Sequence, residues 1–146
     1  MNWNHKDEWS VRSTDFMVQV TRHSVQPIEG MEGDEGENRW CVYAYIYPKH
    51  PKFSEFTKEA IYQPATENIP LHGGCSFCRI HVNSAGERTS VQVGADYNHL
   101  HDDEFTFFAT QKEAWEVFHD GDKLFNYLDK FGKVKEVEAT TDWSAA

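Results

Sequence analysis

Residues 75–96 read CSFCRIHV (75–82), NSAGE (83–87) and RTSVQVGAD (88–96), and this stretch decides the fold. The first and last segments alternate apolar or β-branched residues with polar ones, which is the pattern of half-buried strands. The segment between them is rich in turn-forming residues and contains a glycine, as hairpin connections commonly do. We therefore predict two antiparallel strands over the outer segments, joined by a short turn.

Two further strand patterns lie before this hairpin. Residues 14–25 alternate with the period of a half-buried strand. Residues 39–47, RWCVYAYIY, are β-branched and aromatic throughout and predict a central strand, which two prolines end. Between these patterns, residues 29–38 combine three glycines with five carboxylates. Such a segment cannot bury one face, so we expect a mobile acidic loop.

The helical signals follow the hairpin. Residues 52–70 show only a weak pattern, compatible with a short helix, and residues 105–108 suggest a fifth strand. Thr110 and Glu113 form a capping-box pattern, which predicts that a helix begins there. The helix has an apolar stripe that residues 120–122, Asp-Gly-Asp, interrupt, so two short helices are compatible with it.

The sum of these elements is an α+β fold, with an antiparallel sheet of four to five strands and a C-terminal helical layer. The chain has 146 residues, 39% of them hydrophobic and 14% aromatic, which suits one domain over residues 1–146. Residues 133–146 read as a polar tail apart from one tryptophan.

Net charge and hydropathy limit the classes of partner that the chain can bind. Fourteen Lys and Arg against 24 Asp and Glu give a net charge of −10, which repels nucleic-acid backbones and anionic membranes. No apolar run approaches the roughly 20 residues that a membrane helix needs, and the N-terminus lacks the plan of a secretory signal. We expect a cytoplasmic protein that binds neither nucleic acid nor membrane directly.

Reactive side chains gather at both ends of the predicted hairpin. His72-Gly73-Gly74 precedes its first strand, and GADYNHLHDD, residues 94–103, includes the end of its second strand and the residues that follow. Because the open ends of a hairpin meet, we expect one cluster. Its candidate catalytic residues are His72, Asp96, His99 and Asp102.

Imidazoles and carboxylates are ligands of zinc, manganese and iron, and they also form general acid/base pairs. Asp96, His99 and Asp102 recur at every third residue, so a helical turn would gather them as ligands of a divalent metal, whereas an extended segment would separate them. Gly73 and Gly74 would let a ligand approach the backbone, and Tyr97 is a further candidate ligand-binding residue. A purely structural role, capping turns and bonding carbonyls, stays open.

Cysteine chemistry is a weaker hypothesis. Cys41, Cys75 and Cys78 cannot all pair within one chain, and we expect reduced, mostly buried thiols. His72, Cys75, Cys78 and His81 contain the residue types of a zinc site, but a strand over 76–82 points Cys78 and His81 to opposite faces. A redox role for Cys75 and Cys78 would need a helix after the first cysteine, where the pattern predicts a strand.

Four motifs in order carry a resemblance: Trp40-Cys41-x-Tyr43, His50-Pro51 after Pro48, His72-Gly73-Gly74-x-Ser76-Phe77 and Gly94-x-Asp96-x-x-His99-x-x-Asp102. Over residues 39–103 this order resembles a group of small, mostly uncharacterised proteins encoded by tailed bacteriophages and prophages. The group has no cysteine pair after His-Gly-Gly and no settled activity. The resemblance therefore implies a phage accessory protein acting in the host cytoplasm, and it adds His50 to the candidate ligand-binding residues.

Three function classes remain open. The first is a site that binds or hydrolyses a small, nucleotide-like ligand, with a divalent metal or an acid/base pair. The second is an acidic, anti-CRISPR-like inhibitor of a host defence or nucleic-acid enzyme, whose charge imitates nucleic acid in a basic groove. The third is a structural accessory without a pocket. The sequence leaves the metal, the ligand, the host target and the oligomeric state undetermined.

Overall fold

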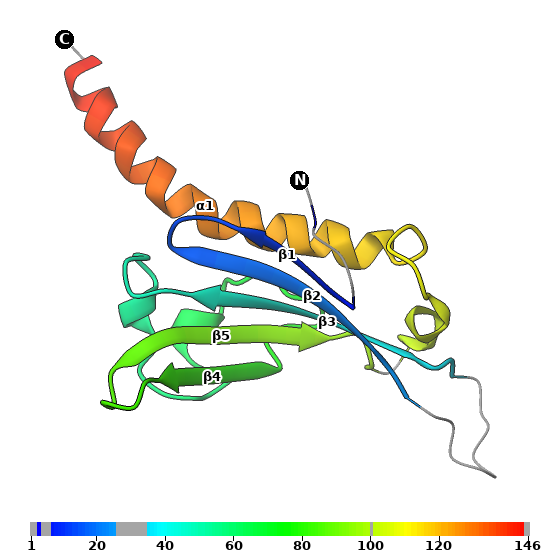
Figure 1. The fold of residues 1–146 in the computed structure, drawn as a ribbon. Coiled ribbons are helices and arrows are strands. Elements are labelled where there is room, and N and C mark those ends of the chain that lie inside the picture. The colour runs from blue at the N-terminus through cyan, green and yellow to red at the C-terminus, as the bar shows by residue number, and fades with distance from the viewer. Residues whose placement is uncertain (1–2, 4–6, 26–34, 100, 145–146) are drawn as a thin grey trace.

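The computed structural model is a five-stranded antiparallel sheet with one long helix packed against it, so the α+β class is confirmed (Figure 1). The structure describes residues 3, 7–25, 35–99 and 101–144, with the backbone alone from residue 132 onward. The strands lie in the order β1-β2-β3-β5-β4. Their bounds are β1 (Glu8–Arg12), β2 (Phe16–Ser24), β3 (Asn38–Ile46), β4 (Phe77–Val82) and β5 (Arg88–Asp96).

The predicted hairpin is confirmed as β4 and β5. Cys78 pairs with Val93 and Ile80 with Val91, and a register shift at residues 81–82 leads into the turn. Asn83 organises this turn, because its side-chain oxygen accepts the backbone N–H groups of Ala85 and Glu87 at 2.9 and 3.0 Å. This pairing brings the residues before β4 and those after β5 to the same end of the sheet.

One face of the sheet carries the core. Alternate residues of the strands are fully buried there, among them Val18, Val42 and Val93. Helix α1 (Trp115–Ser144) packs over β2 and β3, and it contributes an apolar stripe to the same buried cluster, made of Val117, Phe118, Leu124 and Leu128. Within the described residues, no helix is both long enough and apolar enough to cross a membrane.

The connection from β3 to β4 includes residues 52–70, whose weak pattern was compatible with a short helix. It contains two three-residue 3-10 helices, η1 (Phe53–Glu55) and η2 (Pro64–Thr66). Its buried residues Phe56, Ala65 and Ile69 join the core cluster. Pro64 begins η2, where a missing backbone N–H costs nothing.

The predicted fifth strand over residues 105–108 is wrong. These residues fall largely in η3 (Asp103–Phe107), a 3-10 turn that buries Phe105 and Thr106. The fifth strand is instead β1, which pairs with β2 at one edge of the sheet. Its sequence, EWSVR, alternates polar and apolar residues over only five positions, and it pairs with β2 along its whole length.

Helix α1 is continuous through residues 120–122, so the alternative of two short helices does not hold. Gly121 is buried, and a Cβ at this position would lie 3.0 Å from the Trp3 ring and 3.5 Å from Val20. The glycine thus admits an aromatic ring against the helix, and the burial offsets its cost of about 1 kcal/mol in a helix interior.

Three further predictions concern the start of α1, its C-terminal part and the loop after β2. The Thr110 hydroxyl accepts the Glu113 backbone N–H at 3.1 Å as predicted, but the Glu113 carboxylate accepts the N–H of Ala109, and the helix begins only at Trp115. Most of the predicted polar tail, residues 133–144, continues α1. Residues 26–34, which include most of the predicted acidic loop, lie outside the described residues.

Candidate functional site

Three of the predicted site residues converge at the open end of the β4–β5 hairpin. His72 precedes β4, whereas His99 and Asp102 follow β5. One ligand atom from each of the three side chains lies within 4.8 Å of the other two. We call these three residues the His/Asp group. Among the described residues, no other group of three or more His, Cys, Asp and Glu side chains could hold a metal ion.

Asp102 is the centre of this group. Nε2 of His72 lies 2.9 Å from both carboxylate oxygens of Asp102. Nδ1 of His99 lies 3.2 Å from Oδ2, and the His99 backbone N–H donates to the same oxygen at 2.9 Å. A neutral His72 that donates from Nε2 presents Nδ1 as an acceptor.

The charge state of Asp102 follows from these contacts. Its side chain is only 9% exposed, and this burial by itself raises the carboxyl pKa. The hydrogen bonds from the His99 backbone and from His72, together with the His72 charge, outweigh the burial and hold the pKa below its usual range. Asp102 is therefore an ionised carboxylate between two imidazoles at neutral pH.

A compact turn after β5 brings His99 and Asp102 together. The Asp102 backbone N–H donates to the His99 carbonyl at 3.0 Å, and His101 takes a left-handed conformation with φ of 75°. Asp96 caps the start of this turn by accepting the Asn98 N–H at 3.1 Å. Its Oδ1 lies 3.7 Å from Nδ1 of His99, and its side chain is half-exposed. The turn thus places all three residues near one another, but His72 stands in the His/Asp group where the sequence suggested Asp96 as a metal ligand.

Tyr97 forms one wall of the site. Its ring stacks on the imidazole of His72 with a centroid distance of 4.3 Å and an interplanar angle of 14°. Its hydroxyl donates to the carboxylate of Asp120 on α1, and burial followed by this bond raises the tyrosine pKa. The ring of Phe105, in η3, packs against a second side of His72, with 5.7 Å between the two ring centroids. Tyr97 therefore connects helix α1 to a histidine of the His/Asp group.

Gly73 lies beside the His99 ring. An added Cβ would lie 3.1 Å from Cε1 of His99, and the residue has a positive φ of 71°. Gly74 follows with φ of 89°, and its N–H donates to the Leu71 carbonyl at 2.9 Å. Both glycines adopt a backbone conformation that other residues rarely take. The His-Gly-Gly motif thus lets the chain turn directly against the His99 ring.

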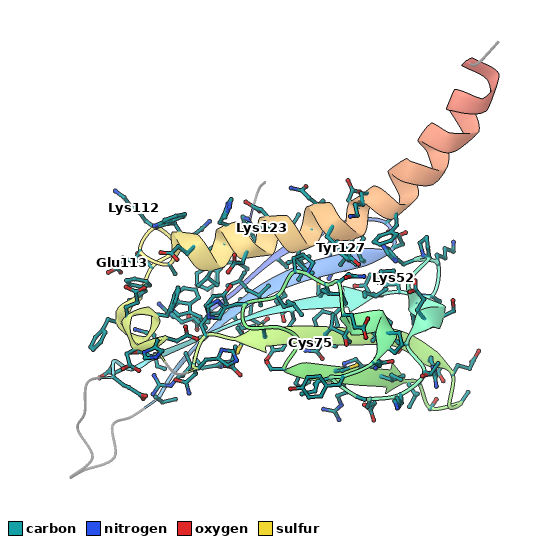
Figure 2. The ribbon with its side chains drawn as sticks, turned by 180° about the vertical axis from the view of Figure 1, so that it is seen from behind. Lys52, Cys75, Lys112, Glu113, Lys123 and Tyr127 are labelled. Atoms are coloured by element: carbon teal, nitrogen blue, oxygen red, sulfur yellow. The ribbon has the colours of Figure 1, made fainter. Side chains whose placement is uncertain are left out.

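The same turn borders a cavity of about 420 Å³. The loop between β3 and β4 forms the rest of its wall, and Cys75, labelled in Figure 2, lies beside the two glycines. We call it the glycine cavity; it is lined by Ile61, Tyr62, Gln63, Thr66, Glu67, Ile69, Gly73, Gly74 and Cys75.

His50 lies outside the His/Asp group. It is 3% exposed, its Nδ1 accepts the Lys52 backbone N–H at 3.0 Å, and its Nε2 lies 2.9 Å from the Leu128 carbonyl of α1. Because Nδ1 is an acceptor, Nε2 carries the proton and donates to Leu128. Lys52 reaches over the Tyr127 ring of α1 at 5.7 Å, close to it in Figure 2. His50 thus fastens the loop after β3 to the helix.

The cysteines take other partners. All three are free thiols, and the Cys75 thiol donates to the Phe77 carbonyl at 3.2 Å. Cys78 packs against the core cluster, while Nε2 of His81 lies 2.8 Å from the Gln92 side-chain oxygen. The described residues therefore do not assemble the set of two cysteines and two histidines.

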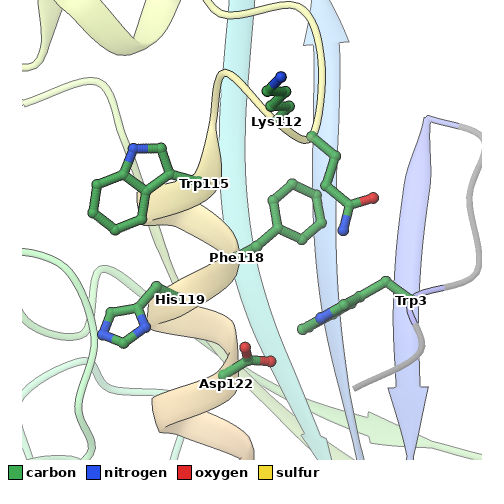
Figure 3. A pocket seen from close by; sticks show the side chains of 7 residues that line it. Trp3, Lys112, Trp115, Phe118, His119 and Asp122 are labelled. Atoms are coloured by element: carbon green, nitrogen blue, oxygen red, sulfur yellow. The ribbon is translucent and has the colours of Figure 1, made fainter.

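A second cavity, of about 600 Å³, lies at the start of α1 (Figure 3). Trp3, Trp115 and Phe118 form its aromatic part, with His119 and Asp122 along the helix. It contains no member of the His/Asp group. The sequence patterns pointed to neither this cavity nor Asp120, because both depend on how α1 packs.

The arrangement can bind a metal or transfer protons, since it combines two imidazoles with an ionised carboxylate beside a cavity. No protein-family model, no curated protein and no solved structure matches the chain.

Proposed function

We propose that the chain binds a divalent transition-metal ion through His72, His99 and Asp102, and that the bound ion supports hydrolysis of a small, phosphorylated, nucleotide-like ligand. One observation supports this above all: three ligand atoms of the types that zinc and iron prefer lie within 4.8 Å of one another. Two imidazoles and one carboxylate leave coordination positions open, as catalytic metal sites do.

Two of the three separations between these atoms, those from Asp102 to Nε2 of His72 and to Nδ1 of His99, fit a metal. With bonds of about 2.1 Å, neighbouring ligand atoms lie about 3.0 Å apart around an octahedral ion and about 3.4 Å apart around a tetrahedral one. The distances from Asp102 to His72 and His99 are 2.9 and 3.2 Å. Small side-chain movements would therefore suffice for binding.

The proposed reaction consumes one water molecule. A metal ion held by His72, His99 and Asp102 would lower the pKa of a water molecule, whose oxygen would form the new bond to phosphorus. The bond from phosphorus to the leaving oxygen breaks, and that oxygen takes up a proton. His72 is a metal ligand in this proposal, and the rings of Tyr97 and Phe105 pack against it on two sides.

The biological setting is part of the proposal. The order of the four motifs over residues 39–103 supports an accessory protein of a tailed phage, acting in the infected cell. The motif residues His72, Gly73, His99 and Asp102 form one site rather than separate surface features.

The decisive experiment is the metal content of the chain purified without chelator. We expect near-stoichiometric metal in the wild type and its loss in the His72→Ala/His99→Ala double variant. His119→Ala is the matched control, because this exposed histidine of α1 lies outside the group. Folded wild-type protein that neither contains nor takes up Zn²⁺, Mn²⁺ or Fe²⁺ would overturn the proposal and favour the acidic-inhibitor alternative.

A further inference from the structure

The glycine cavity and the His/Asp group share one turn of the chain. His72 belongs to the group, Gly73 touches the His99 ring on one side and lines the cavity, and Gly74 continues the cavity wall. None of the three proposed metal ligands lines the cavity, so a substrate that occupies it would reach the metal past Gly73. Its volume of about 420 Å³ is within the range of about 300–1,000 Å³ that is usual for small-molecule sites.

Two polar side chains in the wall, those of Gln63 and Thr66, are already engaged in hydrogen bonds with backbone carbonyls. Gln63 donates from Nε2 to the carbonyls of Lys58 and Ala60 at 2.8 and 2.7 Å. The Thr66 hydroxyl donates to the Ile61 carbonyl at 2.8 Å. These groups keep the loop in shape and leave little hydrogen-bonding capacity for a ligand, so contacts with Ile61, Tyr62 and Ile69 would dominate binding.

The charge of the cavity wall excludes an anionic group of the ligand from the cavity. None of the lining residues is Lys, Arg or His, and the single charged one is the carboxylate of Glu67. An anionic group in the cavity would find no cation and would be repelled by Glu67. A phosphate must therefore lie at the metal site and not in the cavity.

We propose that the glycine cavity binds the uncharged ring of the substrate while its phosphoryl group lies at the His/Asp group. The substrate class is thus an aryl or nucleoside phosphate, whose ring is apolar on its faces and carries no negative charge. This inference rests on the proposed metal site, and it adds which part of the substrate is recognised and where.

The test uses the zinc-loaded full chain and two phosphonates that are not hydrolysed. Phenylphosphonate and methylphosphonate present the same metal-binding group and differ in the ring. We expect phenylphosphonate to bind at least about tenfold more tightly, as measured by isothermal titration calorimetry. A carboxylate at the para position, in 4-carboxyphenylphosphonate, should remove most of this preference, because of Glu67.

Variants of the cavity residues test whether the cavity causes the preference for phenylphosphonate. Cys75→Phe fills the cavity and should bring the two affinities to within about twofold, with zinc and methylphosphonate binding unchanged. Tyr62→Ala removes an 85% exposed ring from the rim and should reduce the preference about threefold without risk to folding. Ser84→Phe, in the exposed hairpin turn, is the control and should leave the preference intact.

The outcomes separate the two proposals. Equal affinity of the two phosphonates for zinc-loaded wild type would overturn the cavity assignment and leave the metal site standing. A phenyl preference that neither Cys75→Phe nor Tyr62→Ala changes would also overturn it. Failure of the wild type to bind zinc would overturn both.

Discussion

His50 and His72 are both histidines of the predicted site, and the structure gives them opposite surroundings. His50 is 3% exposed, and backbone groups of Lys52 and Leu128 occupy both of its ring nitrogens. The side chain of His72 is 28% exposed, and Nε2 bonds the Asp102 carboxylate. No hydrogen bond joins Nδ1 of His72 to another residue of the described ranges.

The difference teaches how to separate structural from reactive histidines. An imidazole with one backbone donor and one backbone acceptor has a fixed tautomer and no free lone pair, so it cannot bind a ligand without breaking the fold. An imidazole whose hydrogen-bond partner is a carboxylate side chain can exchange that bond for a bond to a metal without leaving a backbone group unpaired. Residue type and sequence position do not reveal this difference, because it depends on the partners.

Among these predictions, replacement of His50 should have the largest effect, which is a loss of fold stability. His50→Ala leaves the Lys52 N–H buried without a partner, at about 1–3 kcal/mol, and it removes one hydrogen bond, worth about 1 kcal/mol, from the Leu128 carbonyl, which keeps its bond within α1. We expect the free energy of unfolding to fall by about 3 kcal/mol in urea titrations. Zinc stoichiometry of the folded fraction should not change. Lys49→Ala, at an exposed neighbour, is the control, and a loss below about 1 kcal/mol in His50→Ala would contradict this assignment.

His72→Ala should weaken zinc binding and leave the stability of the fold almost unchanged. It removes one proposed metal ligand, so zinc affinity should fall about 100-fold in competition titrations with a chelator. The unfolding free energy without metal should change by less than about 1 kcal/mol, because Asp102 keeps both contacts from His99. A variant that unfolds as readily as His50→Ala would erase the distinction between the two histidines.

Tyr97→Phe sharpens the comparison within the site. The ring that stacks on His72 remains, but the hydroxyl that reaches Asp120 is lost. We expect a loss of about tenfold in zinc affinity, smaller than in His72→Ala, because the histidine is less well oriented. Tyr45→Phe is the matched control, since this ring stacks on His81, outside the His/Asp group. An affinity equal to that of the wild type would show that Asp120 does not position His72.

The smallest expected effect concerns the reactivity of the Cys78 thiol. Burial, and then the proximity of Cys75, raise the pKa of Cys78 to about 11, so roughly one thiol in a thousand is ionised at pH 8. Iodoacetamide should therefore modify Cys78 slowly, and the rate should rise about tenfold per pH unit up to about pH 11. Mass spectrometry of peptides measures this rate. Added Zn²⁺ should leave it unchanged, whereas protection by zinc would revive a cysteine-containing metal site.

Local patterns were sufficient where neighbours in sequence are neighbours in space. The β4–β5 hairpin follows from alternation and a turn, and this alone predicted that His72 would meet His99 and Asp102. The choice between Asp96 and His72 as the third member was beyond the pattern. It depends on the turn in which Asp96 accepts the Asn98 N–H and Asp102 faces both histidines.

Contacts between distant segments explain the remaining errors. Strand β1 pairs with the edge of β2, and its alternation of polar and apolar residues is too short to predict a strand without that partner. Helix α1 continues through Gly121 because Trp3 packs there. Phe105 is buried in a 3-10 turn beside His72 and Tyr97, although a short aromatic run suggests a strand. Tertiary packing decided each of these elements.

The position of the His/Asp group at the open end of the hairpin has a consequence for folding. A metal bound there would join residue 72 to residues 99 and 102, and so would act as a reversible cross-link around the whole β4–β5 hairpin. Unpairing of β4, an edge strand, would then require release of the ion. Amide hydrogen exchange in β4 should slow when Zn²⁺ is added, while β1 at the opposite edge should exchange as before.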